Sequence, residues 1–168
     1  MYRVLIVCTG NICRSPMATA ILRSWLERDH VPAVEVSSAG TYAQDGAPAS
    51  RLGDVVLKEN GITPPVHRAR LLHRNIIEKA DIVLAMEASH AYEILRIAPD
   101  AERKVHLLGG YGADDAEGKD LTIFDPIGGS EDDYRRCYAI IESHLRRAYP
   151  ALRKEMLESA RAAKQRYR

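Results

Sequence analysis

Short apolar runs alternate with helical patterns along this chain. The first run, Val4–Val7, is continuous and rich in β-branched residues, which is typical of a strand buried on both faces. From Ser15 onwards, apolar residues recur at the spacing of a helix with one buried face. Further strands are expected at Val34–Val36, Asp81–Met86 and Lys104–Leu108. Further helices are expected at about Ser50–Glu59, Arg74–Ala80, Ala91–Ala98 and Glu131–Leu157.

Strands that alternate with helices indicate a parallel sheet with helices packed on both of its faces. We therefore expect an α/β fold: a single domain with a four-stranded parallel sheet. The stretch Gly109–Asp125 is the longest predicted loop. The domain is predicted to span residues 1–150, and residues 151–168 to form a helix end and a basic tail. Within that tail, Lys154–Arg168 is expected to fray rather than to bind a partner.

Length and composition narrow the class of protein. The chain has 168 residues, of which 46% are hydrophobic and 28% are charged, as in a globular domain that folds without disulfides. No run approaches the ~20 apolar residues of a membrane span, and Met1–Val7 lacks the pattern of a signal peptide. A formal net charge of +1 argues against a general nucleic-acid binder. Three cysteines are too few for a disulfide framework, which favours the reducing cytoplasm.

The loop after the first strand carries the most specific chemistry. In an open parallel sheet, ligands bind beyond the carboxyl ends of the strands, and the loop Cys8–Ser15 follows such an end. Gly10 and Asn11 tolerate the positive φ of a tight turn, so that backbone amides can point inward. These amides, the positive end of the following helix and the planar fork of Arg14 together suit a phosphate group.

Cys8 makes the loop a candidate catalytic site. The positive field of the loop stabilises a thiolate, and a thiolate beneath a phosphoryl group is a nucleophile directed at phosphorus. Ser15 could donate a hydrogen bond to the sulfur and help it leave again. Taken singly, a cysteine at a strand end and an arginine at a helix start are ordinary structural residues. Their combination in one loop favours catalysis.

At these residues the sequence resembles the low-molecular-weight protein tyrosine phosphatases. Val7–Ala18 matches the phosphate-loop signature of that family almost fully. Similar segments occur at Ser37–Thr41, at His67–Arg70, and at Phe124–Pro126 followed by Gly128-Gly129. The resemblance covers the chain from Arg3 to about Leu145.

The resemblance implies a cytoplasmic phosphatase without a metal or cofactor, acting on a phosphorylated protein through a phosphocysteine intermediate. Cys8 would be the nucleophile, Arg14 would hold the phosphoryl oxygens, and Asp125 would protonate the leaving oxygen and later accept a proton from water. Thr9, Gly10, Asn11, Ile12, Cys13 and Ser15 would line the phosphate loop. Asn11, Ser38 and His67 match positions of a hydrogen-bond network that supports the loop.

Two positions bear on the substrate. The family's acid motif usually continues with an aromatic residue after Asp-Pro, where this chain has Ile127, and Tyr42 could supply the missing wall of the cleft. Related bacterial arginine phosphatases carry Thr where this chain has Ile12. An apolar Ile12 would fit the side of a phenyl ring, so phosphotyrosine is favoured and phosphoarginine is the alternative.

The other cysteines have expected roles as well. The family often uses a pair such as Cys8 and Cys13 as a reversible disulfide that protects the nucleophile. Cys137 is expected to pack on the final helix, which disfavours a thiol-coupled arsenate reductase. A non-catalytic phosphate-binding redox sensor is a further alternative, and Asp125 argues against it because a carboxylate would repel a bound anion. The sequence names neither the partner protein nor the oligomeric state.

Overall fold

The structure, a computed structural model, describes residues 1–113 and 121–165. Its centre is a four-stranded parallel sheet in the order β2-β1-β3-β4. The strands are β1 (Tyr2–Cys8), β2 (Val34–Gly40), β3 (Ile82–Ala85) and β4 (Val105–Leu107). The predicted α/β fold with a four-stranded parallel sheet is confirmed.

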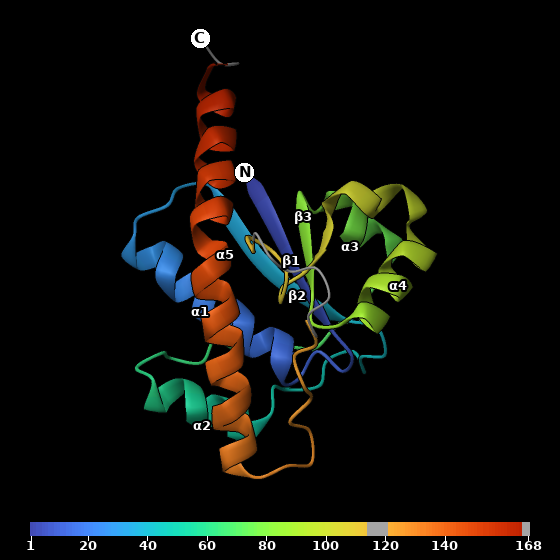
Figure 1. The fold of residues 1–168 in the computed structure, drawn as a ribbon, viewed down its shortest axis with the longest axis vertical. Coiled ribbons are helices and arrows are strands. Elements are labelled where there is room, and N and C mark those ends of the chain that lie inside the picture. The colour runs from blue at the N-terminus through green and yellow to red at the C-terminus, as the bar shows by residue number, and fades with distance from the viewer. Residues whose placement is uncertain (114–120, 166–168) are drawn as a thin grey trace.

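Helices cover both faces of the sheet (Figure 1). One face packs against α1 (Arg14–Arg28), α2 (Arg51–Glu59) and the long α5 (Glu131–Gln165). The other packs against α3 (Arg74–Lys79), α4 (Ala88–Ile97) and the short 3-10 helix η1 (Pro99–Lys104). Side chains of β1 alternate between the two cores, because successive residues of a strand point to opposite faces: Val4 and Ile6 join the first core, and Leu5 and Val7 the second.

Several observed element bounds differ from the predicted ones. β2 continues to Gly40, because residues Ser37 to Gly40 keep pairing with β1 although their side chains are small. α4 begins at Ala88 instead of Ala91, and the turn η1 between α4 and β4 was not predicted. Residue propensities predict such short turns and helix starts poorly, because packing against neighbouring elements determines their conformation.

The last helix is longer than predicted, because α5 continues to Gln165 instead of ending near Leu157. Its later part still packs on the body, since Leu152 and Met156 are fully buried. Glu155 also accepts hydrogen bonds from the hydroxyls of Tyr2 and Tyr111. These contacts tie the part of the helix beyond residue 150 to the start of β1. Within the described part of the chain, no helix is long and apolar enough to cross a membrane.

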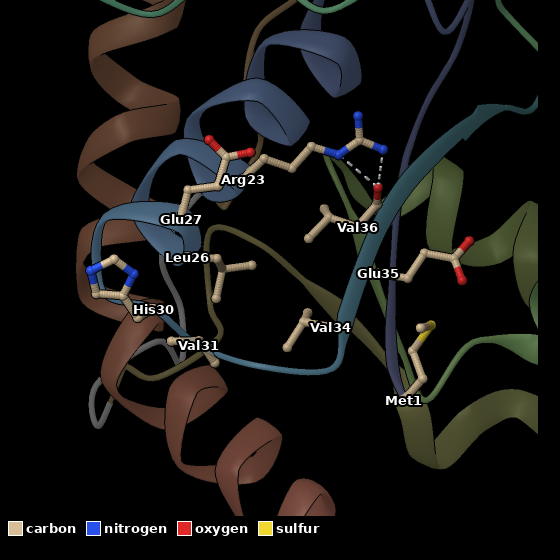
Figure 2. A pocket seen from close by; sticks show the side chains of 9 residues that line it. All are labelled: Met1, Arg23, Leu26, Glu27, His30, Val31, Val34, Glu35 and Val36. Carbon is tan, nitrogen blue, oxygen red and sulfur yellow. Dashed lines mark hydrogen bonds between the residues drawn. The ribbon is translucent and has the colours of Figure 1, made fainter.

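β2 is one of the two edge strands of the sheet, and arginines cover two of its carbonyls. Arg23 of α1 donates to the carbonyl of Val36 through Nε and Nη2 (Figure 2). Arg70 donates through Nε to the carbonyl of Ser38, at 2.7 Å. An uncovered edge strand invites pairing with other chains, and these two side chains occupy the groups that such pairing would use.

Candidate active site

The loop Cys8–Ser15 connects the carboxyl end of β1 to the start of α1, as predicted. Neighbouring segments hold its backbone in place. The Thr41 amide donates to the Cys8 carbonyl, and the Tyr42 amide donates to the Thr9 carbonyl, both at 3.0 Å. On the other side, the Ser50 amide donates to the Ile12 carbonyl at 2.7 Å. The loop is therefore fixed by β2 and by the N-terminus of α2 as well as by its own turn.

The left-handed residue of the loop is Asn11, with φ 54°. Gly10, which would also tolerate a positive φ, does not adopt one. Asn11 also has side-chain contacts that stabilise its conformation, whereas a glycine would have none. The glycine that the loop requires lies on β2: a Cβ on Gly40 would stand 2.4 Å from the Thr9 carbonyl oxygen and 2.9 Å from the Asn11 nitrogen.

Asn11 is completely buried and joins the residues expected to support the loop. Its Nδ2 donates to the hydroxyl of Ser15 at 2.9 Å and to the hydroxyl of Ser38 at 2.8 Å. Its Oδ1 accepts from the Arg70 amide at 3.0 Å, and its carbonyl lies 2.6 Å from Nε2 of His67. Burial lowers the pKa of His67. The structure thus brings Asn11, Ser38 and His67 together, and it adds Arg70 to them.

Cys8 lies at the floor of the loop, 2% exposed. Its Sγ is 3.0 Å from the Oγ of Ser15. Because Ser15 accepts a hydrogen bond from Asn11, its own hydroxyl hydrogen is available to the sulfur. A donated hydrogen bond stabilises a thiolate, both before attack and when sulfur acts as the leaving group. Asn11 and Ser15 therefore form a donor chain that ends at Cys8.

Arg14 is 1% exposed, and four groups hold its guanidinium. Nη1 donates to Glu87 at 3.0 Å and to the carbonyl of Ile123 at 2.9 Å. Nη2 donates to the Thr9 hydroxyl at 3.1 Å and to Asp125 at 2.8 Å. The buried Nε has no hydrogen-bond partner among the described residues. A buried donor without a partner is costly. The edge formed by Nε and Nη2 therefore suits two oxygens of a phosphate group.

Asp125 lies above the loop with its side chain 34% exposed. Its Oδ2 faces Arg14, and its Oδ1 accepts the Ile127 amide at 3.1 Å. The turn that follows is closed by a hydrogen bond from the Gly129 amide to the Pro126 carbonyl, at 2.9 Å.

The start of α5 fixes the other end of this turn. The Ser130 amide donates to the Asp133 carboxylate at 2.8 Å, and the Asp133 amide donates to the Ser130 hydroxyl at 3.3 Å. The backbone and hydroxyl of Ser130 lower the pKa of Asp133, so this cap is ionised at neutral pH. A capped helix start thereby positions the carboxylate of Asp125 over the loop.

The match to a known family agrees with this geometry. The sequence profile described as "low molecular weight phosphotyrosine protein phosphatase" matches residues 3–158. The chain belongs to this family. It is a phosphatase, and its substrate is a phosphoprotein by family membership. Among the described residues, no group of three or more His, Cys, Asp or Glu side chains could hold a metal ion.

Relatives of this phosphatase fall into two named activities. The chain is 40% identical to a protein-arginine-phosphatase of Geobacillus stearothermophilus over 92% of this chain and 98% of the relative. It is 37% identical to a low molecular weight protein-tyrosine-phosphatase of Streptomyces coelicolor, over 92% and 96%. The crystal structure of the Geobacillus arginine phosphatase aligns with a TM-score of 0.80, covering 94% of this chain and 97% of that one.

Two site residues of the phosphatase were not predicted from the sequence. Glu87 and His90 lie at the start of α4, just beyond the carboxyl end of β3, which is the neighbour of β1 in the sheet. Glu87 binds Arg14, and Nε2 of His90 lies 2.8 Å from the Thr9 hydroxyl. Ligands bind beyond the carboxyl ends of parallel strands, and this rule applies to β3 as it does to β1. The position of Glu87 and His90 just after a strand was therefore the sequence signal that could have identified them.

The electrostatics of these two groups follow from burial and from Arg14. Burial alone would raise the pKa of Glu87, but hydrogen bonds from Ser89 and Arg14 outweigh it, and the pKa is lowered. Burial and the Arg14 charge lower the pKa of His90 to about 4. At neutral pH Glu87 is therefore ionised and His90 is neutral. Of these three groups, only Arg14 carries a positive charge.

The remaining cysteines of the phosphatase are buried and free. The Sγ of Cys13 lies 3.1 Å from the Tyr134 hydroxyl, which also accepts a hydrogen bond from Ser50 at 2.9 Å. Burial raises the pKa of Cys13. Cys137 lies on the buried face of α5 and faces the carbonyl of Phe124, and burial raises the pKa of Cys137 to about 12. Both thiols are therefore protonated at neutral pH.

Two of the residues predicted to shape the substrate cleft are exposed, and the third is partly buried. Tyr42 is 74% exposed and follows β2, and Ile127 is 59% exposed and follows Asp125. Ile12 is partly buried and packs against the core of α1, α2 and α5. Exposed large apolar side chains are few in the described chain, and Tyr42 and Ile127 are two of them. The Tyr42 amide donates to the Thr9 carbonyl of the Cys8 loop, and Ile127 follows Asp125, which contacts Arg14.

Proposed function

We propose that this phosphatase hydrolyses phosphotyrosine in proteins through a phosphocysteine intermediate on Cys8. The observation that carries the proposal is the arrangement of three groups around one loop. The Cys8 sulfur meets the Ser15 hydroxyl, Arg14 contacts Thr9 of the loop through Nη2 and leaves Nε without a partner among the described residues, and the Asp125 carboxylate meets the same Nη2. Such an arrangement offers a nucleophile, charge stabilisation and an acid to one phosphoryl group.

In the first step, the Cys8 thiolate attacks phosphorus. A sulfur–phosphorus bond forms while the bond from phosphorus to the phenolic oxygen breaks. The leaving oxygen takes a proton from Asp125, which must first exchange its contact with Arg14 for one with the substrate. The incoming phosphoryl oxygens replace the carboxylate on the guanidinium. Glu87 and the Ile123 carbonyl keep the Nη1 end in place during this exchange.

In the second step, water attacks the phosphocysteine. Asp125, now ionised, accepts the proton of that water, and the sulfur–phosphorus bond breaks to release phosphate. The hydroxyl of Ser15 stabilises the departing thiolate at 3.0 Å. Each step transfers one proton through Asp125, so the site returns to its initial state without any cofactor.

The residues predicted to shape the cleft support phosphotyrosine over phosphoarginine. Tyr42, Ile127 and Ile12 offer apolar surface to a phenyl ring. A phosphorylated guanidinium carries N–H donors that need acceptors. Glu87 stays engaged with Arg14, and Asp125, once released from Arg14, must deliver its proton to the leaving group. The second candidate is phosphoarginine, which the 40% identity to the arginine phosphatase of Geobacillus stearothermophilus supports.

A non-catalytic phosphate sensor fits less well. A carboxylate placed over an anion weakens binding, whereas an acid at that place is what a poor leaving group needs. Cys13 adds a proposed redox function, in which it forms a disulfide with an oxidised Cys8. We place the protein in the cytoplasm, where its three free thiols stay reduced.

The decisive experiment compares three substrates: p-nitrophenyl phosphate, a phosphotyrosine peptide and a phosphoarginine peptide. We expect release of phosphate from the first two, and none in Cys8→Ser. The variant Ile12→Thr tests the contribution of Ile12. It replaces an apolar β-branched side chain with a β-branched side chain that carries a hydroxyl. It should raise the ratio of phosphoarginine to phosphotyrosine turnover. Preference of the wild type for phosphoarginine would overturn the substrate assignment, and no turnover of any substrate would overturn the enzyme assignment.

A further inference from the structure

A second cavity adjoins the active-site loop without including it. Its volume is about 260 Å³, and none of the residues Cys8–Ser15 lines it. It lies between α1, β2 and the segment before α3. Its polar lining consists mainly of Thr19, Arg23, Ser38, His67, Arg68 and Arg70. The lining, all of it in the described chain, contains basic and hydroxyl groups and no carboxylate.

The three arginines of this cavity have no carboxylate partner among the described residues. Arg23 donates to the Val36 carbonyl through Nε and Nη2 (Figure 2). Arg70 donates through Nε to the Ser38 carbonyl, and Arg68 is exposed. Burial lowers the pKa of Arg70, opposed by Glu35 outside the cavity. Three guanidinium groups around one hollow therefore retain N–H donors that no acidic side chain occupies.

Thr19 supplies a second, independent observation. It is 5% exposed, and within the described chain its hydroxyl has no hydrogen-bond partner. A threonine inside a helix usually donates to the carbonyl one turn earlier, and Thr19 does not. A buried hydroxyl without a partner costs free energy unless a ligand or water completes it. Thr19 lines the same cavity as the arginines.

We propose that this cavity binds a tetrahedral oxyanion, such as a phosphate group. Guanidinium groups from separate segments match such a ligand, because each offers paired N–H donors to its oxygens. The Thr19 hydroxyl completes the set with a neutral donor. Nearby carboxylates do not block the site, since Asp54 and Glu35 act on His67 and Arg70 from outside the lining.

The larger hollow on the other side of Arg23 has different chemistry. Its volume is about 820 Å³, and Figure 2 shows the carboxylates of Glu27 and Glu35 among the side chains that line it. These two carboxylates would repel an oxyanion. The smaller cavity, whose lining has no carboxylate, therefore suits an oxyanion better.

Two residues of the proposed site contact Asn11, the residue that holds the Cys8–Ser15 loop in shape. His67 and Arg70 line the cavity, and both also bind Asn11. Asn11 in turn bonds Ser15, which contacts Cys8. The two anion sites therefore lie on either side of one buried side chain. This assignment does not rest on the identity of the phosphoamino acid substrate.

The test is a titration of isotope-labelled protein with inorganic phosphate, followed by NMR, with chloride at matched ionic strength as reference. We expect two saturation curves, one from the amides of Gly10–Ser15 and one from the amides and arginine side chains of His67–Arg70. Arg68→Met should weaken the second curve about tenfold, the size of one charge-assisted hydrogen bond. Thr19→Val should weaken it as well, because it keeps the shape and removes the donor.

Arg51→Met is the matched control, since Arg51 is an exposed arginine on α2 outside the cavity. It should leave both curves unchanged. Shifts at His67–Arg70 that follow the Gly10–Ser15 curve and survive Arg68→Met would overturn the proposal, because they would report the active site through Asn11. A phosphoserine peptide that binds the cavity more tightly than inorganic phosphate would identify a phosphorylated protein segment as the ligand. Tighter binding of inorganic phosphate would identify the free ion.

Discussion

Gly40 allows β2 to approach the catalytic loop, and replacing it with alanine tests that contact. An added Cβ would lie 2.4 Å from the Thr9 carbonyl oxygen, 2.9 Å from the Asn11 nitrogen and 2.9 Å from the Cβ of Ala43. Non-bonded contacts to a Cβ below 3.0 Å are essentially never observed, so the backbone must separate by at least about 0.6 Å at Thr9. Two of these atoms belong to the catalytic loop, and neither can rotate away.

The expected cost is that of overpacking, about 1–3 kcal/mol. For a chain of 168 residues each kcal/mol lowers Tm by about 2–4 °C, so thermal unfolding should shift by roughly 5 °C. The loss of catalytic rate should be larger than the loss of stability alone would cause. Displacement by about 1 Å at a reacting centre can cost about a hundredfold in rate. We expect kcat/KM for p-nitrophenyl phosphate to fall by about ten- to a hundredfold in Gly40→Ala.

Gly53→Ala is the control, because it adds the same methyl group elsewhere in the first core. Its Cβ would meet Met17 at 3.5 Å, an ordinary contact, and alanine favours helix α2. That variant should keep the activity and Tm of the wild type or gain slightly in stability. If Gly40→Ala retained wild-type kcat/KM and Tm, the close approach of β2 would not determine the shape of the loop.

Three further predictions concern single side chains. Asp125→Asn should lower kcat for phosphotyrosine about 10²–10⁴-fold, and less for p-nitrophenyl phosphate, whose leaving group needs less protonation; equal losses would contradict its role as acid. His90 has its pKa lowered from 6.5 to about 4, so below pH 6.5 only the unfolded chain gains its proton and stability declines as pH falls. In urea unfolding, His90→Gln should lose less stability than wild type between pH 7 and 5, and parallel losses would refute this. After peroxide treatment, dithiothreitol should restore wild type fully and Cys13→Ala much less; equal recovery would refute the protective disulfide.

Local pattern was sufficient to predict most elements and the position of the Cys8–Ser15 loop. The alternation of strands and helices predicted the sheet, and residues Cys8 to Ser15 form one continuous segment between β1 and α1. Their proximity therefore follows from chain connectivity alone. Pattern failed where packing decides the backbone, as at η1 and at the start of α4. It also named both Gly10 and Asn11 as tolerant of a positive φ, and only the structure shows that Asn11 alone of the two adopts it.

Residues that act across elements were the ones missed. Gly40 matters because a strand passes close to a loop, and Glu87 and His90 matter because β3 lies next to β1. Residue type alone does not separate any of these residues from an ordinary strand or helix residue, and for Glu87 and His90 the available signal was their position after a strand. The predicted parallel sheet would have placed Glu87 near Arg14 only if the order of its strands were also known.

The sequence by itself pointed to the proposed chemistry of this phosphatase, because the proposed nucleophile Cys8, the rest of its loop and Arg14 are consecutive in the chain. Only the tertiary structure decided how that chemistry is held. Arg14 meets Glu87 and Asp125, which lie 73 and 111 residues away along the chain, and Asn11 meets His67 and Ser38. Hydrophobic periodicity specifies which face of an element is buried, but not which element lies beside it. The strand order β2-β1-β3-β4 supplies that information.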